Sequence, residues 1–589
     1  MKARMFSTAM LLVMCAGVRL SFADDVGAAD VVLFNTKVWT ADERLRLAEA
    51  VAVKGSEIVA VGDNEEILKL RGPHTVSFDG RDRLVVPGFV DTHTHFENAT
   101  EWFFEVRLMD VDNQSEMLRR LAQAVNRVPK GLWITGGDWG ELAARDAAKK
   151  GNDNYISFIP DLAEIDAASS EHPVLFRRHD GNYFANSLAL TYLRITRFTP
   201  DPGGGKFIHD SRTGELTGML MGRAGDRAAR ALPPKSRKHT LIAARWLMKE
   251  LNSYGLTGIH DIGRIDAISQ QQLYRTAVER SFSDVSIFQD LRSEGTLTLK
   301  VNAMLPLSTW SDLPRYGITP GSGDEWIRFS ALKAFIDGSM MFEPLDNHPD
   351  YAGGFTFRVE SPRELHDDFL GADRDGWEMA THVIGDKAIA MYLDWLEEAI
   401  KTNGPRDRRP RLIHMEYPSL ADIERAGNLH AFADITPFHM LLEVDQIEEK
   451  VGTERARSAF AGRTLIDLGI RVNLASDMPG DYYRFNENPF NPLVNIFMAV
   501  TRRHPGEEAT RSWHPSEAIS IEEGLRAYTI NPAFAAHDEN ITGSVTVGKR
   551  ADLVLLSSDV LSGTADNLLK TKVLLTLVNG KVVYRDSSP

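Results

Sequence analysis

Alternating hydrophobic and polar residues mark both ends of the chain. Residues 31–39 and 50–61 are rich in Val and Ile and are separated by polar turns, which is the pattern of short β-strands. The same pattern returns at 552–556 and 573–584, where Asn579-Gly580 predicts a tight hairpin turn. We therefore expect the two ends of the chain to build one small β-domain together.

The middle of the chain alternates short apolar strands with amphipathic helices, which is typical of a parallel β/α fold. Eight candidate strands, the number that closes a (β/α)8 barrel, lie at residues 86–92, 256–262, 299–305, 327–336, 377–383, 411–415, 432–436 and 471–475. Residues 97–241 form a connection too long for an ordinary loop. We interpret this stretch as a subdomain inserted over one end of the barrel.

The predicted fold is thus α/β: a TIM-like (β/α)8 barrel with a small β-sandwich domain built from both termini and an inserted subdomain after the first barrel strand. The predicted bounds are 1–23 for a signal peptide, 24–85 and 536–589 for the two parts of the β-sandwich domain, 86–96 for the first barrel strand, 97–241 for the insert and 242–535 for the rest of the barrel.

The amino terminus has the pattern of a secretory signal. Basic Lys2 and Arg4 precede a mostly apolar run, and small residues at 21 and 23 follow it, which predicts cleavage after Ala23 and a periplasmic or secreted protein. The run is shorter than the roughly 20 residues that span a bilayer. Cleavage removes Cys15, the only cysteine, so the mature chain has neither disulfides nor thiolate metal sites.

Composition narrows the class of partner. Of 589 residues, 43% are hydrophobic and 25% charged, which is a globular rather than a disordered composition. The formal net charge of −15 argues against nucleic acid or an anionic membrane as the main partner. A small-molecule substrate is the expected partner, no second segment has the character of a membrane span, and a homo-oligomer is compatible with the composition.

The strongest local signal is the segment Val-Val-Pro-Gly-Phe-Val-Asp-Thr-His-Thr-His at 85–95. Alternate residues of a strand point the same way, so His93 and His95 can present two imidazoles to one ion. A lone His-x-His pair is more often packed or exposed at the surface. Here the pair closes a strand at its carboxyl end, where barrel active sites form.

Four more residues are expected at the ends of later strands: Lys333, His382, His414 and Asp477. Taken singly, each has an ordinary interpretation: a lysine that extends to solvent, two packed histidines and a helix cap. Lys333 can also react with CO₂ to give a carbamate, an anionic oxygen ligand that bridges two metals. Together with His93 and His95 the residues occupy five strand ends, which favours a divalent metal centre.

These ligand types suit zinc and similar divalent ions. A bound metal lowers the pKa of water from 15.7 to about 7. Asp477 is placed to take a proton from that water and to pass it to a leaving amine or alkoxide.

The motifs resemble those of the amidohydrolase superfamily, in particular the YtcJ-like branch (amidohydrolase family 3) that includes N-substituted formamide deformylases. PGFVDTHTH, LKAFIDGS, THVIGDKA, LIHMEYPS and ASDMPGD occur in the expected order, followed by a closing segment at 531–554. The resemblance implies that His93 and His95 bind one metal and that His382 and His414 bind a second. It further implies that carboxylated Lys333 bridges the two and that Asp477 is both ligand and base. Whether one or two metal sites are filled stays open; an unmodified Lys333 favours one.

The chain also departs from that branch. Asp180-Gly181-Asn182 stands where relatives tend to carry Asp-Gly-His, so Asn182 replaces an imidazole that would face the substrate. His439, Tyr183 and Trp139 are further candidates for the substrate pocket, with packing in a core as the alternative for each. The apolar residues 340–342 after Gly338 suggest a hydrophobic substrate group.

Three functions follow from this set. The first is hydrolysis of a carbon–nitrogen bond, other than a peptide bond, in an amide, formamide or cyclic amide. The second is ester or lactone hydrolysis by the same site, because both reactions pass through a similar tetrahedral intermediate. The third is a non-catalytic periplasmic binding or regulatory protein on the same fold, which a surface-exposed Lys333 or Asp477 would support.

Overall fold

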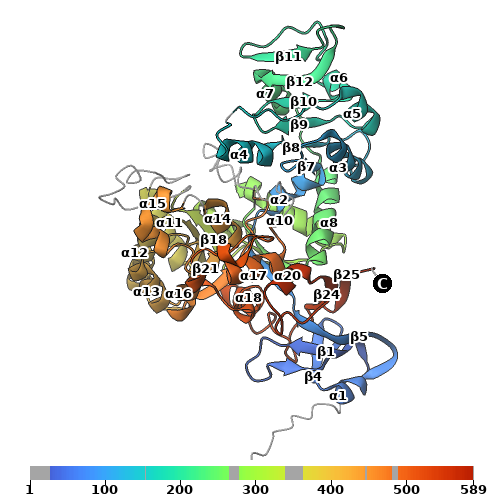
Figure 1. The fold of residues 1–589 in the computed structure, drawn as a ribbon. Coiled ribbons are helices and arrows are strands. Elements are labelled where there is room, and N and C mark those ends of the chain that lie inside the picture. The colour runs from blue at the N-terminus through green and yellow to red at the C-terminus, as the bar shows by residue number, and fades with distance from the viewer. Residues whose placement is uncertain are drawn as a thin grey trace, which may run out of the picture.

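The fold has three parts, arranged one above another in Figure 1. In a computed structural model of the chain, the described residues are 27–152, 154–263, 278–337, 362–444, 447–480 and 489–587. The predicted signal peptide and the apolar residues 340–342 lie outside them. Within the described residues, no helix is both long and apolar enough to cross a membrane.

Both ends of the chain contribute to one sheet, as predicted. Eight of the described strands pair in it, in the order β25-β24-β23-β5-β1-β3-β4 with β2 paired to β1. Their bounds are β1 (Ala29–Trp39), β2 (Leu47–Ala48), β3 (Ala50–Lys54), β4 (Glu57–Gly62), β5 (Arg71–Pro87), β23 (Leu553–Leu556), β24 (Val573–Val578) and β25 (Lys581–Arg585). The turn between β24 and β25 has positive φ at both Asn579 (48°) and Gly580 (73°), as the predicted hairpin requires.

Eight parallel strand positions of the described chain form the barrel. Their bounds are β6 (Phe89–Thr94), β13 (Leu256–Asp261), β14 with β15 (Lys300–Ala303, Leu305–Pro306), β17 with β18 (Ile327–Phe329, Ala331–Phe335), β19 (Glu378–Val383), β20 (Arg411–His414), β21 (Phe432–Ile435) and β22 (Arg471–Leu474). β14 pairs with β17 in a five-stranded sheet and β15 with β18 in a six-stranded sheet, and the chain passes from the first sheet to the second at Met304 and again at Ser330. The ring closes where Thr94 and Met478 form a parallel bridge and the N–H of His95 donates to the Met478 carbonyl over 2.8 Å.

Helices cover the outside of the barrel, so its strands are buried on both faces. This is why the sequences of these strands are nearly continuous apolar runs. The main ones are α8 (Arg237–Ser253), α10 (Val278–Ser293), α11 (Pro362–Arg374), α12 (Asp386–Asn403), α13 (Leu420–Asn428), α14 (Pro437–Glu443), α15 (Ile447–Arg457), α16 (Gly462–Asp467), α17 (Pro492–Thr501), α18 (Ile521–Ala527), α19 (Ile530–Ala535) and α20 (Asp566–Lys570). All described residues of β18 and β19 are buried.

The insert has its own sheet, in the order β11-β12-β10-β9-β8-β7. It is reached from β6 through α2 (Phe96–Ala99) and a short 3-10 turn (Thr100–Phe103). Its elements are β7 (Glu105–Arg107), α3 (Gln114–Arg127), β8 (Thr135–Trp139), α4 (Glu141–Lys149), α5 (Leu162–Ala168), β9 (Leu175–Arg178), β10 (Tyr183–Ala185), α6 (Ser187–Tyr192), β11 (Gly205–His209), β12 (Leu216–Gly222) and α7 (Arg223–Arg230).

Two sequence-based boundaries shift. The predicted strand at 86–92 is divided because the chain changes its partner strand: β5 ends at Pro87, which pairs with β23, and β6 begins at Phe89, which pairs with β13. Gly88 connects β5 to β6, and a Cβ atom at this position would lie 2.2 Å from the Thr257 hydroxyl oxygen. At the other end of the insert, residue 241 lies inside the continuous helix α8 rather than at a boundary.

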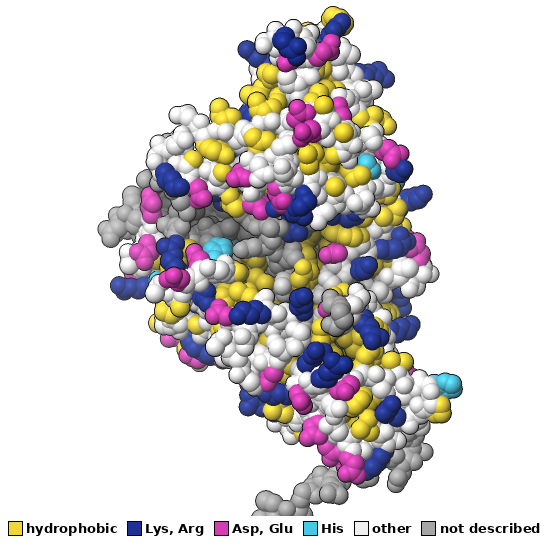
Figure 2. Space-filling view, turned by 45° about the vertical axis from the view of Figure 1, so that its right-hand side comes forward, with side chains coloured by type: hydrophobic (Ala, Val, Ile, Leu, Met, Phe, Trp, Pro, Cys, Tyr) yellow, Lys and Arg dark blue, Asp and Glu magenta, His cyan; other side chains and the backbone are white. Residues whose placement is uncertain are grey.

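Basic and acidic side chains are intermixed over the visible face of the molecule (Figure 2). Lys and Arg are interspersed with Asp and Glu on all three parts of the fold, with hydrophobic side chains between them. The face shown therefore carries charges of both signs rather than a field of one sign.

Candidate metal centre

His93 and His95 lie at the carboxyl end of β6 and are both buried. The Nδ1–H of His95 donates to the Gly263 carbonyl over 2.8 Å, which leaves Nε2 with its lone pair free to bind a cation. Burial also holds the pKa of His93 well below its usual value, so this imidazole is neutral. The two imidazoles therefore lie together at the end of one strand, as the spacing predicts.

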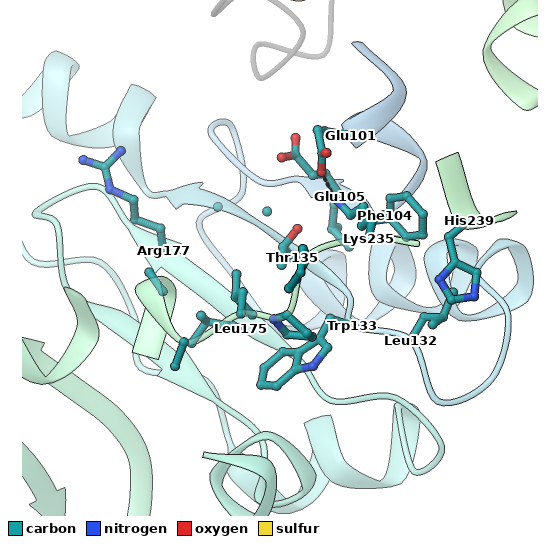
Figure 3. Close-up of a pocket in the computed structure, with 18 of the residues that line it drawn as sticks. Glu101, Phe104, Glu105, Leu132, Trp133, Thr135, Leu175, Arg177, Lys235 and His239 are labelled. Carbon is teal, nitrogen blue, oxygen red and sulfur yellow. Dashed lines mark ion pairs between the residues drawn. The ribbon is translucent and has the colours of Figure 1, made fainter. Parts of the chain in front are cut away.

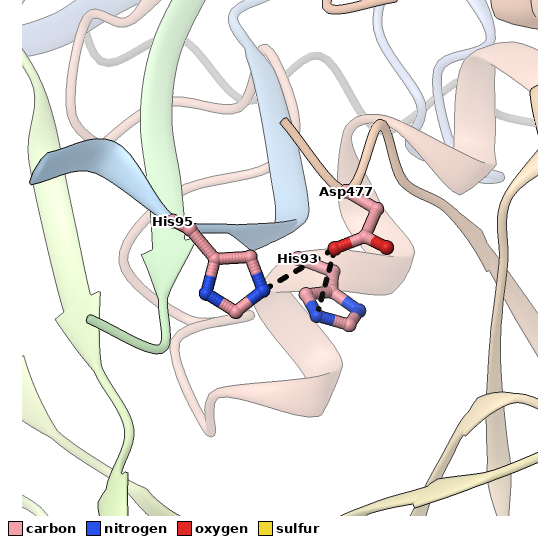
Figure 4. Close-up of side chains that lie close together, drawn as sticks. All are labelled: His93, His95 and Asp477. Atoms are coloured by element: carbon pink, nitrogen blue, oxygen red, sulfur yellow. Dashed lines mark ion pairs between the residues drawn. The ribbon is translucent and has the colours of Figure 1, made fainter. Parts of the chain in front are cut away.

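Asp477 reaches the same point from the end of β22. Its Oδ1 lies 3.3 Å from Nε2 of His93 and 3.3 Å from Nε2 of His95 (Figure 4). Its backbone has a positive φ of 55°, and its N–H donates to the His93 carbonyl over 3.0 Å. A tetrahedral zinc with bonds of about 2.0–2.1 Å keeps its ligand atoms about 3.3–3.4 Å apart. These three side chains have the spacing of ligands around one such ion.

His382 and His414, at the ends of β19 and β20, lie beside this group. The ring centroid of His414 is 4.9 Å from that of His93 and 4.6 Å from that of His382. Burial holds the pKa of both rings well below the usual value. Among the described residues, Nε2 of His382 and Nδ1 of His414 have no hydrogen-bond partner. Unpartnered buried nitrogens of this kind fit metal ligation.

Lys333 lies in the middle of β18 rather than at its end, where sequence analysis had placed it, and its side chain is buried. Its residue is 2% exposed, and in the described part of the chain its Nζ has no hydrogen-bond partner. Nζ lies 4.5 Å from the centre of the Phe335 ring. Burial lowers the pKa of this amine to about 7, so much of it is unprotonated near neutral pH. The alternative interpretation, a lysine whose head reaches solvent, does not fit.

Glu416 and His439 complete the cluster. Nδ1 of His439 donates to Oε1 of Glu416 over 2.6 Å, and Nε2 of His439 lies 3.4 Å from Oδ2 of Asp477. The flanking carboxylates of Glu416 and Asp477 raise the pKa of His439 to about 10, although burial opposes this. Sequence analysis placed His439 only in the substrate pocket and gave Glu416 no role. The one signal for Glu416 was its position two residues after His414.

Two buried carboxylates that sequence analysis also missed hold the backbone of β6 and the first residue of α2. Oδ1 of Asp91 accepts hydrogen bonds from the N–H groups of His93 (3.2 Å) and Ser476 (3.1 Å), which ties the first strand to the last. Oδ1 of Asp261 accepts from the N–H of Phe96 over 2.7 Å. Burial raises the pKa of Asp91 to about 7 and that of Asp261 to about 6. The signal for Asp91 was its place in the same motif as the histidines.

A buried ion pair fills the barrel below the cluster. Arg411 and Asp434 are both 0% exposed, and the guanidinium donates to Oδ2 of Asp434 over 2.5 and 2.9 Å. Arg411 also donates to the carbonyl of Thr92 over 2.8 Å, and Asn473 donates to Asp434. The network thus links four strands and contacts the backbone next to His93.

Two of the three insert residues that were predicted to line the substrate pocket, Trp139 and Asn182, have other roles in the structure. Trp139 is fully buried in the insert's core and its Nε1 donates to the Phe158 carbonyl, so it does not line a pocket. The amide of Asn182 is engaged within the insert, where it donates to Asp180 and accepts from the N–H of Gly222. These two predictions fail because the side chains serve the packing and turn of the insert itself.

Tyr183, by contrast, lines a pocket of about 1080 Å³ in the insert. Figure 3 shows Trp133, Leu175 and Arg177 on one side of this pocket and the Glu101–Lys235 ion pair on the other. Glu97 and Thr100 also line it. Glu97 follows His95 by two residues in the chain, but none of the residues of the candidate metal centre lines this pocket.

Comparisons with known proteins agree with this picture. A model of the amidohydrolase family matches residues 77–584. The chain is 31% identical to "Protein LONG AFTER FAR-RED 3" of Arabidopsis thaliana over 94% of this chain and 92% of that protein. It is 28% identical to "Putative amidohydrolase YtcJ" of Bacillus subtilis, over 93% of this chain and 98% of the relative. Identity is also 28% to "N-substituted formamide deformylase" of Arthrobacter pascens, over 94% of this chain and 98% of that enzyme.

The fold also matches a solved structure. An uncharacterized metal-dependent hydrolase from Pyrococcus furiosus superposes with a TM-score of 0.63 at 22% identity, over 90% of this chain and 100% of that one. At this identity the match concerns the fold alone.

Proposed function

Because the chain belongs to the amidohydrolase family, we propose that it hydrolyses a carbon–nitrogen bond, other than a peptide bond, in an amide, formamide or cyclic amide. The observation that carries the proposal is the spacing at the end of β6. Two imidazole nitrogens lie 3.3 Å from a single oxygen of Asp477, a geometry that suits one divalent ion.

The residues fit a metal by their chemistry as well as their spacing. His93, His95 and Asp477 would hold one zinc, and His382 and His414 would hold a second with a carboxylated Lys333 between them. A zinc ion bound there supplies a Lewis acid that polarises a carbonyl and lowers the pKa of water to about 7. If Lys333 is not carboxylated, these residues favour a single bound ion.

Asp477 is the proposed base. Oδ1 faces the two histidines of β6, and Oδ2 faces His439. A carboxylate so held can take a proton from the attacking water and give it to the leaving nitrogen, so that amine and acid are released without net proton change at the enzyme.

Lys333 is the proposed site of carboxylation. Its unprotonated amine adds to CO₂, with formation of an N–C bond and loss of one proton, and gives an anionic carbamate. The low pKa of the amine and its buried position support this step, because an ammonium ion has no lone pair to react.

The insert pocket is the proposed site for the part of the substrate that does not react. Trp133 and Tyr183 offer aromatic surface, and the Trp133 ring pairs with Tyr192 at 6.0 Å between centroids. An N-substituted formamide with an aromatic or apolar substituent is therefore the substrate type to test first, because the Arthrobacter relative is named as an N-substituted formamide deformylase.

The structure bears differently on the two other functions. Ester or lactone hydrolysis uses the same groups and differs only in the leaving atom. A non-catalytic role would be supported by an exposed Lys333 or Asp477, but the Lys333 residue is 2% exposed and the Asp477 side chain 20%. The geometry thus favours catalysis.

The decisive experiment uses the mature, zinc-loaded chain with matched panels of N-substituted formamides, cyclic amides, esters and lactones. We expect amine release from amides, loss of turnover with a chelator and recovery on adding zinc. Turnover of esters alone would establish the second function. A zinc-loaded protein that binds panel members without turning any over would establish the third.

Export is a separate proposal. We propose that the chain is secreted or periplasmic and is cleaved after Ala23, on the basis of the sequence pattern alone. Amino-terminal sequencing of the protein from its native host should begin at Asp24, and an intact Met1 on the functional protein would refute it.

A further inference from the structure

His439 lies between two carboxylates, in the first turn of α14. Its Nδ1 is 2.6 Å from Oε1 of Glu416, and its Nε2 is 3.4 Å from Oδ2 of Asp477. Its ring stacks on that of His414, with centroids 5.0 Å apart and planes 19° apart. Glu416 is buried, at 3% exposure. The imidazole is thus held on both edges and on one face.

The two oxygens of Asp477 consequently have different neighbours. Oδ1 is 3.3 Å from each Nε2 of the histidines of β6, whereas Oδ2 faces His439. The torsion that exchanges the two oxygens of an aspartate is soft. A carboxylate without a partner for Oδ2 is free to turn both oxygens towards a cation, which removes the oxygen needed as a base.

We propose that Glu416 and His439 are positioning residues: Glu416 orients His439, and His439 holds Oδ2 of Asp477 away from the cation and towards the substrate. This inference rests on the proposed function, because it assigns the pair a part in that reaction. It goes beyond the ligand set, since neither residue is placed among the ligands and the pair acts through Asp477.

The opposing interpretation is a further metal site made of His414, Glu416 and His439, whose potential ligand atoms lie within 4.8 Å of one another. The distances speak against it. Nδ1 of His439 and Oε1 of Glu416 are 2.6 Å apart, which is hydrogen-bond length. Two ligands of one tetrahedral zinc stay about 3.3–3.4 Å apart.

Two amide variants test the contact with little change in size. In H439Q the amide nitrogen reaches the position of Nε2 and retains a donor to Asp477. In H439N the amide occupies the position of Nδ1 and retains only the contact to Glu416. We expect kcat to fall about 10–100-fold in H439N, as for partners that orient a metal ligand, and to be largely retained in H439Q. KM and zinc content should match those of the wild type in both.

The control is H366Q. His366 forms the same kind of pair with Glu398, at 3.1 Å on the outside of the barrel. This variant should leave kcat, KM and zinc content unchanged. E416L should reproduce the loss in H439N, because it removes the group that orients the imidazole.

A second measurement needs no substrate, so it separates this inference from the proposed function. In crystal structures of the zinc-loaded proteins, we expect one oxygen of Asp477 on zinc in the wild type and both in H439N. Equal kcat in H439N and H439Q, loss of zinc in H439N, or an unrotated Asp477 in its crystal structure would each overturn the proposal. Absence of turnover in the wild type would count against the proposed function only.

Discussion

Replacement of Asp477 by Asn tests the assignment of the base most directly. The substitution keeps the shape of the side chain and a carbonyl oxygen at the position of Oδ1, 3.3 Å from the two β6 histidines. In D477N the ring of His439 loses one of the two carboxylates that raise its pKa. As a neutral imidazole it still donates through Nδ1 to Glu416, and its Nε2 accepts a hydrogen bond from the new amide N–H group. The hydrogen bonds of the site are therefore preserved in D477N, while its ability to accept a proton is lost.

The size of the effect follows from that single loss. A positioned general acid–base group contributes about 10²–10⁴ in rate, and each factor of ten corresponds to about 1.36 kcal/mol of barrier. D477N should therefore lower kcat by about 10²–10⁴, or about 2.7–5.4 kcal/mol, with zinc content per chain unchanged when the metal is supplied in excess.

The assay pairs amine release from an N-substituted formamide with elemental analysis of the same samples. Equal turnover of the two fully metal-loaded proteins would show that another group is the base. Loss of zinc together with activity would show that the charge of Asp477 is needed chiefly to hold the metal.

Four further outcomes are expected. H93A should lose zinc, because it removes one of the three ligand atoms at the end of β6; unchanged zinc content would exclude His93 from the ligands. With ¹³C-labelled bicarbonate, the wild type should give a carbamate NMR signal that K333A lacks, and its absence from the wild type would leave Lys333 as a free amine. D434L should lose about 3–5 kcal/mol in the free energy of unfolding measured in urea, because it leaves the Arg411 guanidinium buried and unpaired. The double variant R411M/D434L should regain most of this loss, and a D434L variant as stable as the wild type would refute the argument. W133A should raise KM for substrates with a bulky apolar substituent and leave kcat unchanged. A fall in kcat with unchanged KM would show that the insert pocket does not bind the substituent.

The barrel strands and the two β-rich ends follow from local patterning. A buried parallel strand needs a short, nearly continuous apolar run, and such runs stand at each of the eight positions. His93, His95, His382 and His414 were recognisable because each lies at the carboxyl end of such a run, and those ends meet at one rim of a barrel.

The insert shows the limit of that reasoning. Trp139 and Tyr183 are both aromatic residues on or beside short strands, yet one lies in the insert's core and the other lines a pocket. In a strand, which face is covered depends on the neighbouring elements rather than on the residue itself.

The sequence alone determined the kinds of element, their order and the chemistry of the ligands, because hydrophobic periodicity and side-chain type are local properties. Only the tertiary structure decided which atoms meet. Three sets of contacts join residues on different strands or loops. One oxygen of Asp477 lies near the two histidines of β6 and the other near His439. His439 pairs with Glu416, and Arg411 pairs with Asp434. Their distances depend on how the ring of strands closes, and that geometry is set by the packing of the whole barrel.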